Sequence, residues 1–81
     1  MLKEGAIGSL RYVSFLAGEQ HKYLLDTDGL GIYLVHGNIT VFTTEERQEM
    51  KEGDFLFLRK AQREVVITAE EESVCVVRRL I

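Results

Sequence analysis

Few residues of this chain combine a reactive type with a spacing that would let them act together. His21 and His36 have no second ligand or base at a useful spacing, which favours exposed or turn positions, with a pocket-rim contact as the alternative for His36. The single cysteine, Cys75, stands among valines, and this is typical of a small buried side chain rather than a nucleophile. No zinc-ligand spacing and no Ser/His/Asp or Cys/His grouping can be assembled. The sequence therefore favours binding or assembly over catalysis.

Three tyrosines and two small basic groups are better suited to recognition. Tyr12, Tyr23 and Tyr33 offer flat apolar bodies with one polar end, which suits pocket walls and interfaces, although core packing is the alternative. The net charge is −3 and the pI about 5.3, so we expect no direct contact with nucleic acid. The basic groups at 59–63 and 78–79 are too sparse for that role. If a partner is acidic, these groups are where we expect it to dock.

The elements that must position these residues are short strands. The chain has 81 residues, seven glycines and no proline, and no segment has the periodicity of a long amphipathic helix. The clearest hairpin signal is Gly37-Asn38, between two β-rich runs. We expect one domain over 1–81, an all-β sandwich or barrel of about eight strands. The expected strands are Leu10–Leu16, His21–Leu25, Gly31–Val35, Ile39–Thr43, Glu49–Lys51, Phe55–Leu58, Val65–Thr68 and Val74–Val77.

The N-terminal segment does not resemble a secretory signal. Glu4 and Arg11 interrupt what would have to be its apolar core, and no apolar run approaches the ~18 residues of a membrane span. A lone cysteine cannot form an intramolecular disulfide. We therefore expect a cytoplasmic protein without a membrane partner.

Two glycine-containing segments resemble the conserved core of the cupins. These segments are Tyr33–Val41, which contains the Gly37 hairpin, and Met50–Leu58, which contains a Gly53-Asp54 turn, and an apolar strand follows them. The backbone must reverse sharply at both glycines, which a Cβ would resist. The resemblance implies a small cupin-like jelly-roll barrel.

The same resemblance implies that the metal site of enzymatic cupins is lost. Counted from the two glycines, the ligand positions fall near Tyr23 and Leu25, at Leu30 and at Glu64. Only Glu64 carries an oxygen ligand, and one carboxylate does not make a divalent-metal site. We therefore expect no metal and no other cofactor.

A narrower resemblance points to regulation. The strand Phe55-Leu56-Phe57-Leu58-Arg59-Lys60, followed by Val65-Val66, is similar to the metal-free N-terminal domains of AraC-type transcriptional regulators, in particular the activators of type III secretion genes. That resemblance implies a domain for self-association, or for docking an effector or a regulatory protein. The chain departs from the full family because it has no helix-turn-helix region.

Three hypotheses follow. The first is a non-enzymatic domain that forms a homodimer, or binds a regulatory protein, by an apolar sheet face or an edge strand. Its expected interface is the first strand, with Leu10, Tyr12, Val13 and Phe15. The second is a small-molecule site inside the barrel, and the third is a metal-free isomerase with Glu64 as general base, which lacks a second acid or base. The interior site would be lined by Tyr23, Leu25, Ile32, Leu34, Phe57 and Glu64.

Overall fold

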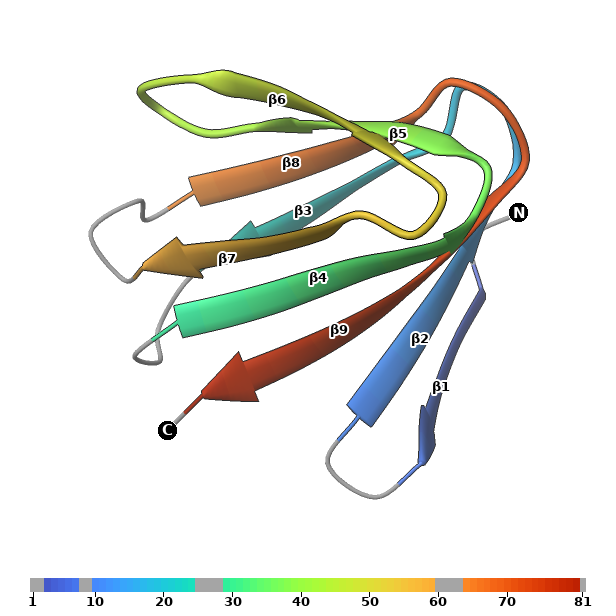
Figure 1. Cartoon of the computed structure of the whole chain (residues 1–81), viewed down its shortest axis with the longest axis horizontal. Coiled ribbons are helices and arrows are strands. Elements are labelled where there is room, and N and C mark those ends of the chain that lie inside the picture. The colour runs from blue at the N-terminus through green and yellow to red at the C-terminus, as the bar shows by residue number, and fades with distance from the viewer. Residues whose placement is uncertain (1–2, 8–9, 25–28, 60–63, 81) are drawn as a thin grey trace.

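The computed structural model describes residues 3–7, 10–24, 29–59 and 64–80, which form two antiparallel sheets (Figure 1). The larger sheet has the strand order β1-β2-β9-β4-β7, and the smaller one β3-β8-β5-β6. Within these ranges no helix is long and apolar enough to cross a membrane. The strands are β1 (Lys3–Ile7), β2 (Leu10–Phe15), β3 (Gln20–Leu24), β4 (Gly29–His36), β5 (Asn38–Phe42), β6 (Arg47–Lys51), β7 (Phe55–Arg59), β8 (Glu64–Ala69) and β9 (Ser73–Leu80).

The core lies between the sheets, and its side chains come from alternate positions along the strands. Successive side chains of a strand point to opposite faces, so every second residue can be apolar and buried. Each core side chain is at most 6% exposed to solvent. The core consists of Val13, Phe15, Tyr23, Leu30, Ile32, Leu34, Ile39, Val41, Met50, Leu58, Val65, Ile67, Ala69, Cys75 and Val77.

The turn between β4 and β5 is fixed by a glycine and a buried serine. Because β4 pairs with β7 and β9 whereas β5 pairs with β6 and β8, the expected Gly37-Asn38 hairpin is wrong, and this turn instead carries the chain from one sheet to the other. Gly37 has a φ of +98°, and a Cβ there would collide with Ser73 Oγ and lie 2.5 Å from the Glu72 carbonyl oxygen. The Asn38 amide donates to Ser73 Oγ at 3.0 Å, and the same hydroxyl donates to the Glu71 carbonyl at 2.7 Å. The predicted Gly-Asn turn is thus held against the start of β9.

The expected all-β class and jelly-roll layout are confirmed, with one strand more than expected. The additional strand is β1, which pairs with β2 in the register Lys3↔Ser14 to Ile7↔Leu10. Its Lys, Glu and Gly residues have low strand propensity, so its sequence gave little signal. Because β2 lies between β1 and β9, its backbone is paired on both sides. The expectation that the strand Leu10–Leu16 is an edge is therefore wrong.

Candidate functional site

The interior, where the second hypothesis places a ligand, is occupied by buried side chains. Ile32 and Leu34 are fully buried, and Tyr23 is 6% exposed. The Arg79 guanidinium lies 5.6 Å from the centre of the Tyr23 ring, and His21 meets that ring edge-on at 4.4 Å. Leu25 falls outside the described residues.

Two residues expected inside the barrel lie on its outer surfaces. In β8, Glu64 pairs with Leu24, one position away from the inward pair Tyr23 and Val65. The Glu64 side chain is 47% exposed and forms an ion pair with Lys22 at 3.3 Å. Phe57 is 45% exposed on the larger sheet. The expectation that Phe57 and Glu64 line the interior is therefore wrong, and Glu64 has no access to an internal cavity.

The remaining reactive groups do not assemble into a catalytic or metal centre. Burial raises the pKa of the Cys75 thiol to about 12, which keeps it protonated at neutral pH. His36 Nδ1 lies 3.0 Å from Glu52 Oε1 in an exposed pair. Over the described part of the chain, no three His, Cys, Asp or Glu residues are placed to hold a metal ion together.

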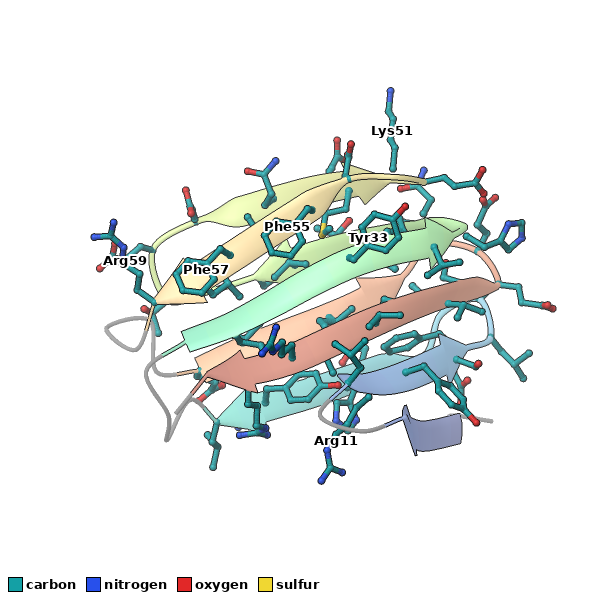
Figure 2. All side chains as sticks on the ribbon, turned by 60° about the horizontal axis from the view of Figure 1, so that its bottom comes forward. Arg11, Tyr33, Lys51, Phe55, Phe57 and Arg59 are labelled. Carbon is teal, nitrogen blue, oxygen red and sulfur yellow. The ribbon has the colours of Figure 1, made fainter. Side chains whose placement is uncertain are left out.

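The outer face of the larger sheet instead gathers apolar and aromatic side chains (Figure 2). Across β2, β9, β4 and β7, one row of paired residues consists of Tyr12, Val76, Tyr33 and Phe55. The adjacent row places Gly31 between Arg78 and Phe57. We call this surface the outer aromatic face, and it comprises Leu10, Tyr12, Gly31, Tyr33, Phe55, Phe57, Val76 and Arg78.

Solvent reaches much of this face. Phe55 is 65% exposed, and Tyr12, Tyr33 and Phe57 are each more than 40% exposed. Single exposed apolar residues are normal, but a contiguous patch marks an interaction surface. The outer aromatic face therefore has the character of a binding surface.

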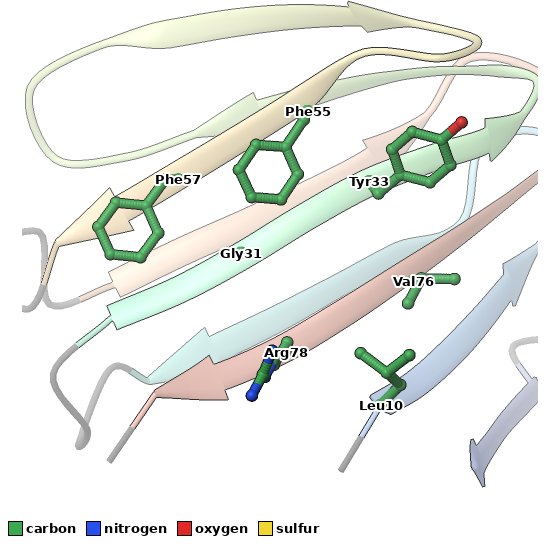
Figure 3. A pocket seen from close by; sticks show the side chains of 7 residues that line it. All are labelled: Leu10, Gly31, Tyr33, Phe55, Phe57, Val76 and Arg78. Atoms are coloured by element: carbon green, nitrogen blue, oxygen red, sulfur yellow. The ribbon is translucent and has the colours of Figure 1, made fainter. Parts of the chain in front are cut away.

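The face is hollowed over Gly31 (Figure 3). The hollow has a volume of about 310 Å³, with Phe55 and Phe57 on one side and Leu10 and Arg78 on the other. A Cβ at Gly31 would lie 3.2 Å from the Phe55 ring, and one at Gly29 would lie 2.7 Å from the Phe57 ring. The absence of side chains at these two glycines therefore leaves room for the rings, Phe55 over Gly31 and Phe57 over Gly29.

The charge of the outer aromatic face is of one sign. The Arg78 side chain is exposed, and among the described residues its guanidinium makes no hydrogen bond or ion pair. None of the described side chains at the outward positions of β2, β9, β4 and β7 is acidic. These positions are Leu10, Tyr12, Ser14, Val74, Val76, Arg78, Gly29, Gly31, Tyr33, Val35, Phe55, Phe57 and Arg59. The face is thus locally positive on a chain whose net charge is −3.

The four residues of the predicted interface lie on two different faces of the larger sheet. Leu10 and Tyr12 point outward and belong to the outer aromatic face. Val13 and Phe15 are each 1% exposed and belong to the core, so the expectation that they contact a partner is wrong. Both come from a strand whose two faces are apolar, so its sequence did not reveal which face is buried.

Comparisons with known proteins identify the fold. No family model matches the chain, and no curated protein matches it in sequence. A cupin superfamily protein from Desulfitobacterium hafniense is similar in structure, with a TM-score of 0.79 and 12% identity over 100% of this chain and 77% of that one. Drosophila melanogaster CENP-C bound to CAL1 has a TM-score of 0.74 and 16% identity, over 96% and 80%.

A transcriptional regulator of the HTH_3 family from Vibrio cholerae is also similar, with a TM-score of 0.69 and 17% identity. The match covers 84% of this chain but only 39% of the regulator. Identities this low show a shared architecture and nothing finer. The nine described strands in two antiparallel sheets, together with the likeness to solved cupin structures, show that the chain has the cupin fold.

Proposed function

We propose that this domain is a non-enzymatic regulatory module that acts by pairing with a second copy of itself through the outer aromatic face. The observation that carries the proposal is the exposure of three aromatic rings on neighbouring strands. Tyr33, Phe55 and Phe57 are between 43% and 65% exposed. Burying them against an apolar surface would be favourable by roughly 25 cal/mol per Å², and aromatic residues are the usual anchors of protein interfaces.

The size and layout of the face suit a two-fold pair. The molecule extends 30 and 28 Å along its longer axes, so a whole face offers roughly 800 Å², about what each partner buries in a stable interface. The next outward positions, Val35 and Val74, continue the apolar surface. A two-fold axis through the Val76–Tyr33 row would set the Arg78 side chains of the two copies at opposite ends.

The regulatory part of the proposal has separate support. One structural neighbour is a transcriptional regulator, and another is bound to a second protein. The Phe55–Lys60 segment is similar to the regulatory domains of AraC-type activators. The non-enzymatic part is supported by the exposed Glu64–Lys22 ion pair and by the protonated, buried Cys75.

Sedimentation equilibrium tests the pairing. The wild-type domain is expected to form a dimer that dissociates reversibly on dilution. Phe57→Ser should raise the dissociation constant roughly 30-fold, because loss of an aromatic anchor costs ~2 kcal/mol or more. Phe42→Ser is the matched control, since Phe42 is 39% exposed on the other sheet. A wild-type domain that remains monomeric at millimolar concentration would contradict the proposal. Equal effects of the two substitutions on the dissociation constant would also contradict it.

A further inference from the structure

Arg78 lies beside an apolar hollow, and none of the described residues supplies it with a counter-ion. Gly31 separates Arg78 from Phe57 in the paired row, so the backbones of the two flanking residues are two strand spacings, about 9–10 Å, apart. Gly31 contributes backbone to the lining of the hollow, the Phe55 ring leans over this glycine, and the Phe57 ring leans over Gly29. The hollow thus has a flat apolar body and one cationic end.

We propose that this hollow binds a small amphipathic carboxylate, an aryl or short acyl acid, and that its binding competes with pairing of the domain. The apolar body would lie in the hollow against Phe55 and Phe57, and the carboxylate would accept hydrogen bonds from the Arg78 guanidinium (Figure 3). The competition rests on the proposed pairing, because ligand and second copy would occupy the same face. The binding of the carboxylate itself does not depend on the proposed pairing.

Charge and size favour this occupant. The outward positions of the described central strands carry no carboxylate, so the same face of a second copy cannot neutralise Arg78. A free carboxylate can neutralise Arg78, because a guanidinium binds a carboxylate through two parallel hydrogen bonds, in a bidentate geometry. The volume of about 310 Å³ is at the small end of ligand pockets, which run from roughly 300 to 1,000 Å³. A single ring with a short acidic chain fits that space better than a larger ligand.

The binding is tested by NMR titration of the ¹⁵N-labelled domain with 3-phenylpropanoate and with the isosteric neutral 3-phenylpropanamide. We expect saturable shifts of the Gly31 and Arg78 amides, and at least tenfold tighter binding of the acid than of the amide. Arg78→Met should remove that preference, and Arg78→Lys should restore part of it. Arg47→Met, on the outer face of the other sheet, is the charge-matched control and should keep the preference.

Equal affinity for acid and amide, or shifts centred away from Gly31, would overturn the binding site. If Arg78→Met does not fold, Arg78→Lys still carries the test, because it retains the charge and loses the two-pronged contact. The amide spectrum of each variant without ligand is compared with that of the wild-type domain, to check that the variant is folded.

The competition is tested separately, by sedimentation equilibrium in the presence of saturating 3-phenylpropanoate. The dimer dissociation constant is expected to rise at least fivefold in the wild type and to stay unchanged in Arg78→Met. If the acid binds at Gly31 and the dimer is unaffected, the regulatory link is wrong while the site stands. If the wild type is monomeric throughout, the proposed pairing fails, and the titration still decides the site.

Discussion

At the scale of single residues, this domain depends on where the backbone turns with a positive φ. Gly18, Gly37 and Gly53 all adopt such φ values, between +85° and +98°. Their surroundings differ, because a Cβ at Gly18 or Gly53 would meet open space whereas one at Gly37 would meet the backbone around Ser73. The three glycines therefore share a conformational requirement, and only Gly37 adds a packing requirement.

Gly37→Ala is expected to destabilise the domain far more than Gly18→Ala. The second substitution costs the positive φ alone, about 1 kcal/mol, while the first adds a collision with a backbone that cannot move freely. We expect a difference of at least about 2 kcal/mol in the free energy of unfolding. Urea denaturation of both variants measures it. Equal losses would show that the turn between β4 and β5 does not press against the start of β9.

The buried thiol of Cys75 predicts a loss of stability at alkaline pH. Its pKa is raised from 9.0 to about 12 in the folded protein because burial disfavours the thiolate. The unfolded chain therefore releases this proton first, so the contribution is fully present below pH 9 and is lost as the pH rises from 9 to 12.

Cys75→Ala tests this, because tyrosines and lysines titrate alike in both proteins. The slope of unfolding free energy against pH above 9 should be shallower in the variant, by at most about 1.4 kcal/mol per pH unit. The native thiol should also resist iodoacetamide at pH 8. Parallel slopes together with rapid alkylation would contradict the burial of Cys75.

At the scale of elements, the sequence predicts the strands better than it predicts which way they face. Gly37 and Gly53 mark local reversals, and these need no knowledge of the rest of the chain. The segment Phe55-Leu56-Phe57-Leu58 is apolar on both faces of the strand. The alternation of side chains therefore cannot show whether the phenylalanines or the leucines are buried. The missing signal lies on β4, where Gly29 and Gly31 alternate with buried residues and leave room for rings from β7.

The position of Glu64 shows the same limit in another form. Counting along a family motif predicts Glu64 inside the barrel, and the structure places its neighbour Val65 there instead. Because side chains alternate, an offset of one residue moves a side chain to the opposite face of a sheet. Register depends on pairing between distant segments, which local patterns do not encode. The outer aromatic face could therefore not be assembled from the sequence.

The orientation of β7 can be measured by two neighbouring substitutions. Leu58 is 2% exposed and Phe57 is 45% exposed. Leu58→Ala should therefore cost ~2–5 kcal/mol of unfolding free energy, and Phe57→Ala should cost less than about 1 kcal/mol in the monomer. Thermal or urea denaturation at low protein concentration gives both values. The reverse order would mean that β7 faces the other way.

At the scale of the whole molecule, a cupin fold with a filled interior carries its recognisable surface on the outside. The core side chains occupy the space between the sheets, and Glu64, the one ligand-type residue at the positions that the cupin resemblance implies for a metal, lies on an outer surface. The larger sheet presents exposed aromatic side chains and an arginine, and the outward positions described on β2, β9, β4 and β7 carry no acidic side chain. We therefore propose that recognition involves a sheet face rather than a cavity of the barrel.

The most direct measurement is an isotope-filtered NOE experiment on a mixture of labelled and unlabelled domain at millimolar concentration. Contacts between copies are expected from the ring protons of Tyr33, Phe55 and Phe57 to Val35, Val74 and Val76, and none from Phe42 or Leu24 on the other sheet. No contacts between copies, or contacts confined to Phe42 and Leu24, would contradict pairing through the outer aromatic face.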